Sequence, residues 1–203
     1  MALALIKEDG TGNPSATTYA SLADGDEYHA GHLYAAAWTA ATPEQKAMAL
    51  VMATRVIDSE YQFNGYRAGF AQALQWPRSE CREPDGGTAG FGARNIQQAA
   101  TRGILPDGPD AIIVQTADWY VPANLVPKAV VAATCELARE LILINRTDAP
   151  EGEGLKYANA GGAQTGYDKS DKRPIIPALV QAMLDKYGTL INRKSGAVRL
   201  VRA

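Results

Sequence analysis

The sequence predicts a mainly α-helical fold: a small bundle of about four helices with short β segments, an extended arm and an extended C-terminal tail. Three observations predict it. Four segments begin at a capping sequence or a proline, and most of them carry apolar residues at three- and four-residue steps. Glycine- and proline-rich stretches separate them. Hydrophobic residues make up 46% of the 203 residues and charged residues 21%, which excludes a largely disordered chain and allows one domain with a buried core.

The first two helices are predicted from their starting residues. Ser21 can cap the amide of Asp24, so we expect a helix from residue 21 to about residue 37. The second begins at Thr42, where the sequence TPEQ combines a capping box with proline at the first helical position. One apolar face then follows, which belongs in a core. It consists of Ala47, Leu50, Val51, Thr54 and Ile57.

Two prolines open the remaining helices. The helix after Pro127 has a continuous apolar stripe, so it should be largely buried. This stripe consists of Val126, Val130, Ala133, Leu137, Leu141 and Ile144. The helix after Pro177 is expected to stop at Gly188. Its apolar residues are Leu179, Val180, Met183, Leu184 and Tyr187.

The connections between these helices have distinct compositions. Residues 3–6 fit a short edge strand, and residues 61–79 form an irregular aromatic stretch that reads as a packed connection. Residues 81–110 are rich in glycine and proline, so we expect a loop with a short helix at 93–101. Residues 111–114 offer a short strand.

Charge divides the chain into an acidic body and a basic tail. The formal net charge is −2, and it becomes −6 when the tail is set aside, because the last eleven residues carry four basic residues and no acid. These four are Arg193, Lys194, Arg199 and Arg202. There is therefore no global basic field that would recruit nucleic acid, and any DNA contact must be local.

The sequence contains no residue pattern that indicates a catalytic or metal site. His29 and His32 stand three residues apart on one helix, but a third ligand and a general base are missing, so a packed or solvated pair is the favoured interpretation. Cys135 lies beside the apolar stripe, where a buried thiol is the ordinary outcome. We expect no enzyme activity and no cofactor. The short apolar start and the lack of an 18-residue apolar run predict neither a signal peptide nor a membrane span.

The aromatic connection allows a nucleic-acid interpretation. Its rings and arginines could stack and hold single-stranded bases. The alternative is that aromatic residues next to a buried helix complete the core. The candidate contacts are Tyr61, Phe63, Arg67, Trp76 and Arg78.

Five short stretches, taken in order along the chain, resemble the head-tail connector or adaptor (head-completion) proteins of tailed bacteriophages. Some members of that family are described as primosomal, DnaT-like single-stranded-DNA-binding proteins. Most telling is the sequence QALQWPRS, which contains Trp76, Pro77, Arg78 and Ser79. The stretches are residues 7–12, 18–29, 53–58, 72–79 and 198–203, and the alanine-rich helix after Pro127 fits between the last two.

The resemblance implies a non-enzymatic virion protein of the neck, made in the bacterial cytoplasm and involved in genome ejection. It implies a ring of identical subunits, typically twelve, under the portal protein, through which double-stranded DNA passes without sequence-specific binding. The next neck or tail-completion protein would assemble on this ring, with no membrane involved. The single adaptor domain would comprise a helical body (about 19–146 and 175–190), a loop-rich insertion (81–120), an arm (147–174) and the tail (191–203).

The resemblance then implies that the arm and the C-terminal tail of the chain make the docking contacts. We expect the arm to contact a neighbouring subunit or the tail component through Leu155, Tyr157 and Tyr167. The tail is expected to dock into the portal through a set of basic and apolar residues. These are Arg193, Lys194, Arg199, Leu200, Val201 and Arg202. The rival hypothesis is a single-stranded-DNA-binding accessory protein of phage replication.

Overall fold

The mainly α-helical prediction is confirmed in a computed structural model, which describes residues 3–84, 120–148, 155–159, 164–167 and 173–191. Five helices lie within these ranges, and the capping box at Thr42 and the starts after Pro127 and Pro177 are as predicted. The helices are α1 (Leu22–Ala30), α2 (Ala36–Ala40), α3 (Pro43–Glu60), α5 (Lys128–Leu143) and α6 (Ala178–Leu184).

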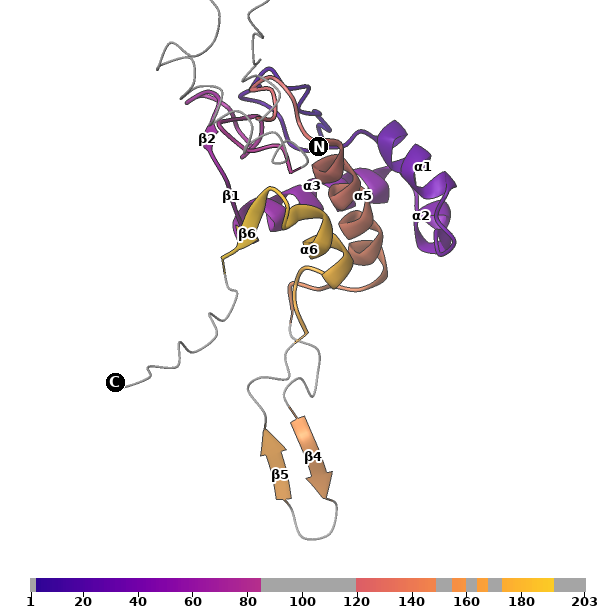
Figure 1. The fold of residues 1–203 in the computed structure, drawn as a ribbon. Helices are drawn as coiled ribbons and strands as arrows, with labels where there is room; N and C mark the ends of the chain where they lie inside the picture. Colours follow the sequence, from indigo (N-terminus) through magenta and orange to yellow (C-terminus); the bar gives the residue numbers. More distant parts are fainter. Residues whose placement is uncertain (1–2, 85–119, 149–154, 160–163, 168–172, 192–203) are drawn as a thin grey trace, which may run out of the picture.

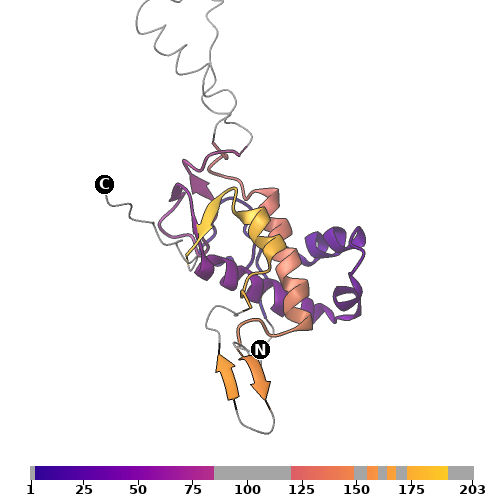
Figure 2. The ribbon, with the colours of Figure 1, turned by 60° about the horizontal axis from the view of Figure 1, so that its bottom comes forward.

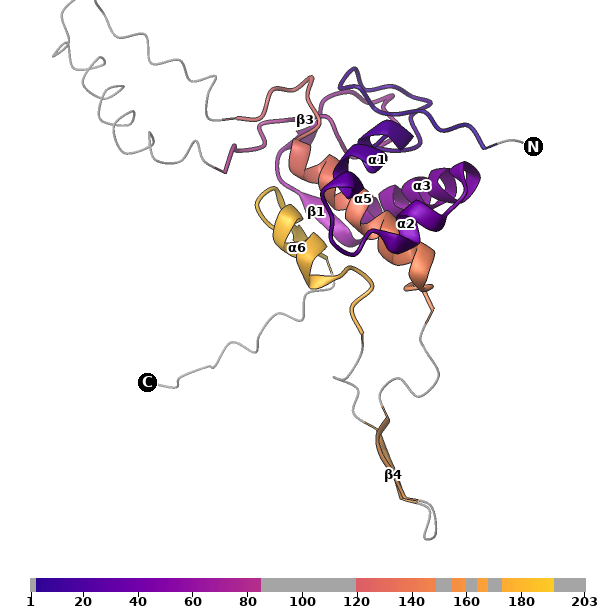
Figure 3. The ribbon, with the colours of Figure 1, turned by 90° about the vertical axis from the view of Figure 1, so that its right-hand side faces the viewer.

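Helix α5 is the centre of the bundle. It packs against α3 across the core, while α6 covers it on one side and α1 and α2 on the other (Figures 1 and 3). Leu50 and Ile57 of α3 and Val130 and Leu137 of α5 are fully buried, as their helical spacing predicts. The apolar faces of α3 and α5 therefore bury each other.

The strands are short and all pair antiparallel in two-stranded sheets. The first sheet joins segments far apart in the chain, with Phe63 opposite Gly188, and ties the connection after α3 to the C-terminal side of α6. The second pairs β2 with β3, and the third pairs β4 with β5 as a hairpin. The strands are β1 (Tyr61–Phe63), β2 (Tyr66–Arg67), β3 (Arg78–Ser79), β4 (Leu155–Asn159), β5 (Gln164–Tyr167) and β6 (Gly188–Leu190).

The predicted first helix is divided in two. Ser21 caps α1 as predicted, but α1 ends at Ala30 and the chain turns before α2. The turn folds Trp38 back onto α1, where its ring is buried and its Nε1 donates a 2.8 Å hydrogen bond to Asp26 Oδ1. Burial of this ring outweighs continuation of a weakly amphipathic helix.

Four other predicted elements differ from the structure or cannot be compared with it. α6 ends at Leu184, earlier than the expected stop at Gly188, because the chain turns there and enters β6. Residues 3–6 form no strand; the neighbouring Lys7 makes an isolated bridge with Thr18. The predicted helix at 93–101 and strand at 111–114 lie outside the described residues.

The β4–β5 hairpin projects away from the helices, beyond the end where α5 finishes and α6 begins (Figures 1 and 2). At its base, Arg146 Nη1 donates to the carbonyl of Pro174 at 3.3 Å, and Arg173 Nη2 donates to that of Asn145 at 3.3 Å. These two hydrogen bonds join the segment that leads from α5 toward the hairpin to the segment that leads from the hairpin to α6. Within the described residues, no helix is long and apolar enough to span a membrane.

Candidate nucleic-acid interface

The aromatic rings predicted to stack on bases lie in the core. Tyr61, Phe63 and Trp76 are at most 2% exposed, and their rings form a continuous series that ends on Tyr187. Tyr61 stacks on Phe63 with centroids 5.8 Å apart, and Trp76 meets Phe63 and Tyr187 edge to face at 5.6 and 5.9 Å. This corrects the stacking hypothesis for these three rings, because enclosed faces are closed to a base.

Arg78 is also committed to the protein interior. Its guanidinium donates to the carbonyls of Asn64, Gly65 and Gln75 at 2.7 to 3.1 Å, and burial lowers its pKa. It is 4% exposed, so it does not face a phosphate, and the expected nucleic-acid contact at Arg78 is corrected as well. The sequence Trp76 to Ser79 is thus a structural element, with Pro77 buried and Ser79 paired with Tyr66.

Exposed aromatic side chains lie on the loop that these interactions support. The side chain of Phe70 is completely exposed and that of Tyr66 is 70% exposed. Arg67, between them in sequence, is exposed and donates one hydrogen bond to the carbonyl of Gln72. We call Tyr66, Arg67 and Phe70 the aromatic edge. Of the five predicted nucleic-acid contacts, only Arg67 belongs to it.

A second pair of exposed residues, Arg82 and Tyr120, lies near this loop in the structure. Ser79 pairs with Tyr66, and three residues later Arg82 forms an isolated antiparallel bridge with Tyr120. Arg82 and Tyr120 are both exposed, but so is Glu80. The local charge is therefore mixed, and any ligand here would be held mainly by stacking.

Sequence reasoning missed Tyr66 and Phe70 as site residues although a signal was present. Tyr66 and Phe70 each follow a glycine in a segment without apolar periodicity. Tyr61 and Phe63, in contrast, are two residues apart, so in a β-strand they lie on the same face. Aromatic residues in a glycine-containing turn are more easily left in solvent than those at alternating positions of a strand.

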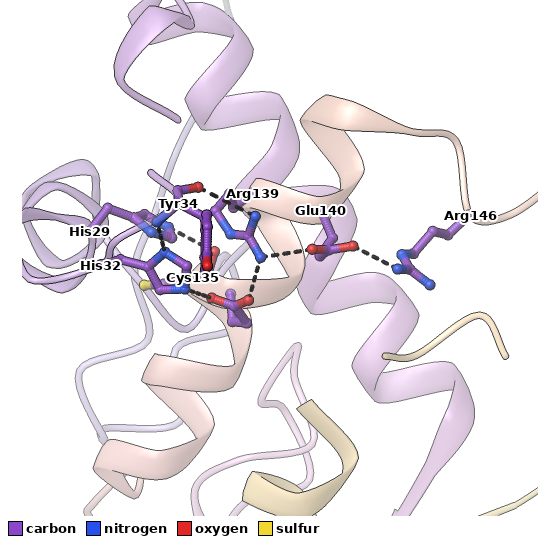
Figure 4. A network of polar contacts seen from close by, with 8 residues as sticks. His29, His32, Tyr34, Cys135, Arg139, Glu140 and Arg146 are labelled. Atoms are coloured by element: carbon purple, nitrogen blue, oxygen red, sulfur yellow. Dashed lines mark hydrogen bonds and ion pairs between the residues drawn. The ribbon is translucent and has the colours of Figure 1, made fainter. Parts of the chain in front are cut away.

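A polar network lies between α5 and the region formed by α1 and the turn that follows it (Figure 4). Arg139 Nη2 donates to Glu136 Oε1 at 2.6 Å and to Glu140 Oε1 at 2.7 Å, and Arg146 donates to the other oxygen of Glu140 at 2.6 Å. His32 Nε2 lies 3.5 Å from the second oxygen of Glu136. Charged groups that are largely buried are thus paired with opposite charges, as their desolvation requires.

The two histidines in this network serve the packing of α1 and α2 on α5. His29 is buried, and its Nε2 contacts the carbonyl of Cys135 at 3.1 Å. Burial lowers the pKa of His29, so the neutral ring is favoured. His32 Nδ1 accepts a hydrogen bond from the amide of Tyr34 at 3.1 Å. The part of the chain that the structure describes contains no group of three His, Cys, Asp or Glu side chains arranged for a metal ion.

Burial also governs the thiol beside this network. It raises the pKa of Cys135 to about 12, which leaves the group protonated at neutral pH. A protonated thiol is a poor nucleophile, so the arrangement supplies structural contacts.

The residues expected to dock the arm and tail are only partly described. Leu155 pairs with Tyr167 across the hairpin, and Tyr157 pairs with Gly166, so all three arm residues lie on the β4–β5 ladder. The predicted tail contacts, from Arg193 to Arg202, lie outside the described residues.

One comparison with known proteins gives a match, and it falls on the N-terminal part of the chain. Residues 3–89 match the model of a family described as "Putative DnaT-like ssDNA binding protein". No curated protein and no solved structure matches the chain. The matched residues contain α1 to α3, the buried aromatic series up to Trp76 and the whole aromatic edge. Just under half of the chain, including the exposed rings of Tyr66 and Phe70, is therefore similar to a family described as DnaT-like single-stranded-DNA-binding proteins.

Proposed function

We propose that the protein binds single-stranded DNA through the aromatic edge. The observation that carries the proposal is the complete exposure of the Phe70 ring, next in the loop to the exposed Tyr66 and Arg67. An exposed phenylalanine costs solubility without contributing to the core, and stacking on a base would cover it. The family match to residues 3–89 supports the same function because it includes this loop.

The binding mode follows from the composition of the edge. Two rings can stack on bases of any sequence, since every base has a π face, and each stacked base contributes about 1–3 kcal/mol. Arg67 and Arg82 can reach phosphates, but the formal net charge of the chain is −2. We therefore expect modest affinity, little sequence preference and a preference for single strands, whose bases are free to stack.

The test is fluorescence anisotropy with a labelled oligothymidylate and the matching duplex. We expect Phe70→Ala and Tyr66→Ala each to weaken single-strand binding by about 5- to 100-fold. Tyr34→Ala is the matched control, because Tyr34 is 72% exposed, lies in the turn between α1 and α2, and uses only its backbone in hydrogen bonds. Equal affinities for all three variants, or no binding by the unmodified protein, would exclude this function.

A second candidate function, the adaptor of a virion neck, is favoured by the projecting hairpin. We propose it as a twelve-subunit ring under the portal protein, which surrounds the passing double-stranded DNA and carries the next neck or tail-completion protein. The β4–β5 ladder stands away from the helical body, as expected of a segment that contacts a neighbouring subunit (Figure 1). In this second candidate function the tail, including Arg199 and Arg202, would dock into the portal, a role that competes with any other binding of the same segment.

Electron microscopy of portal complexes mixed with this protein tests the second function. An added ring at the neck is expected, and deletion of residues 193–203 should abolish it. An unchanged neck would exclude the adaptor. An added ring together with unaffected binding of the oligonucleotide by Phe70→Ala would favour the adaptor over the single-stranded-DNA-binding protein.

A further inference from the structure

A groove of about 740 Å³ lies between the N-terminal segment, α1 and the first half of α5. Apolar side chains of the segment before α5 and of α5 itself line it, including Leu125, Val126 and Val131. Leu125 is 48% exposed, and Val126 and Val131 are partly exposed. The groove therefore offers an apolar surface that the described residues leave open to solvent.

The N-terminal wall of this groove is fixed by hydrogen bonds. The buried carboxylate of Glu8 accepts three backbone N–H bonds of 2.9 Å, from Gly10, Gly12 and Asn13. Gly10 has a φ of +100°, and a β-carbon there would lie 2.0 Å from the carbonyl oxygen of Asn124. The wall thus packs directly on the segment that leads into α5, and the groove exists before any ligand arrives.

The rim of the groove is weakly acidic, with a net charge of −1 when Glu8 is set aside. Asp9 and Glu27 are exposed there, and Asp24 is paired with Lys7 at 2.7 Å. Lys128 is the other basic residue of the lining. The carboxylate of Glu8 is occupied by its three backbone hydrogen bonds. The remaining charged groups of the rim are three carboxylates and two ammonium groups. An apolar floor with an acidic rim suits a peptide in which basic and apolar residues alternate.

We propose that this groove binds the C-terminal segment, residues 192–203, of a second copy of the chain. This segment carries four basic residues and no acidic residue. Its aliphatic residues Val198, Leu200 and Val201 follow Arg193 and Lys194 in the sequence and come before Arg202. Its composition complements both the floor and the rim. The binding is independent of the proposed single-stranded-DNA contact, which lies on another loop.

The end of the described chain and the groove lie on opposite sides of α5, which favours a second copy as the source of the segment. The described chain ends just after β6, on the side of α5 that α6 covers, and α1 lies on the other side (Figures 1 and 3). The groove is lined by residues of α1, so it lies on that other side. A segment that leaves one side of a subunit and binds the other side of the next makes a heterologous contact, which can propagate from copy to copy.

Sedimentation velocity of the full-length protein tests the proposal by complementation. The groove variant is Glu27→Lys/Leu125→Asp, and the tail variant is Leu200→Asp; all three positions are exposed or lie outside the described residues. We expect the unmodified protein to self-associate with an affinity that falls as salt rises, and each variant alone to lose at least tenfold in affinity. An equimolar mixture of the two variants should form a heterodimer, because one intact groove and one intact tail remain.

A control and four contradicting outcomes make the test decisive. Leu179→Asp, on the exposed face of α6, should associate like the unmodified protein. A monomeric unmodified protein, or association unaffected by the groove variant, would overturn the proposal. Loss of association in the groove variant with full association of the tail variant would assign the groove to another segment. A mixture that fails to form heterodimers would overturn the exchange of tails between copies.

Discussion

The hydroxyl of Tyr19 donates a 2.5 Å hydrogen bond to Asp58 Oδ1 and accepts hydrogen bonds from the amides of Gln75 and Trp76 at 3.0 and 3.2 Å. The second oxygen of Asp58 also accepts from the Gln75 amide, at 3.1 Å. One buried tyrosine therefore connects the segment before α1, the end of α3 and the loop that supports the aromatic edge.

Tyr19→Phe should destabilise the protein by about 2–3 kcal/mol, because the amide of Trp76 loses its acceptor while it remains buried. The Gln75 amide keeps Asp58, so the loss is confined to part of the cluster. Urea denaturation at pH 7 measures it. Tyr34→Phe, which removes an exposed hydroxyl, is the control; a loss in Tyr19→Phe no larger than in this control would contradict the role of Tyr19.

Asp58→Asn should remove a pH dependence of stability. Burial raises the pKa of Asp58 to about 6, above its ordinary value of 3.8. The folded state therefore favours the protonated acid, and the stability that this group contributes is fully present below about pH 4 and is lost as the pH rises to 6. The unfolding free energy of Asp58→Asn relative to the unmodified protein should rise by on the order of 2–3 kcal/mol from pH 4 to pH 7. A constant difference across this range would refute the raised pKa.

His29→Gln should flatten a pH dependence of opposite sign. Burial lowers the pKa of His29 below 6.5, so the unfolded chain binds its proton more readily. Stability from this group is present above pH 6.5 and is lost as the pH falls below it. Glutamine can keep a donor to the Cys135 carbonyl without titrating. Thermal denaturation between pH 7.5 and 5 should show a smaller decline in the variant, and an equal decline would assign the effect to other groups.

Gly25→Ala should destabilise the protein by about 1–3 kcal/mol although alanine is the better helix former. A β-carbon at Gly25 would lie 2.4 Å from Cζ2 of the buried Trp38 ring. Gly31→Ala is a matched control in the same region, since a β-carbon there meets no atom within 4 Å. The two melting temperatures should differ by several degrees. Equal values would mean that Trp38 moves away without cost.

Salt should weaken oligonucleotide binding only slightly if the aromatic edge is the site. With Arg67 and Arg82 as the phosphate contacts, the slope of log affinity against log salt is about −1.4, or about sevenfold between 50 and 200 mM. Arg82→Ala should reduce the slope by about 0.7. A much steeper dependence in the full-length protein would place the contacts in the basic tail.

The helices that carry their own start signals and apolar spacing could be predicted from the sequence. The capping box at Thr42, the prolines at 127 and 177 and the helical spacing of Leu50, Ile57 and Leu137 are local features, and a local feature acts before the chain has folded. The mainly α-helical class follows from them. Ser21 as the cap of α1 belongs to the same group.

Which aromatic rings are exposed for binding could not be predicted from the sequence, because it depends on contacts between distant segments. Tyr61, Phe63 and Trp76 are enclosed because β1 pairs with β6, more than 120 residues later in the chain, and brings Tyr187 against Trp76. Phe70 is exposed because no distant segment among the described residues covers it. Burial of a side chain depends on contacts between remote segments, whereas composition and periodicity describe only neighbours along the chain.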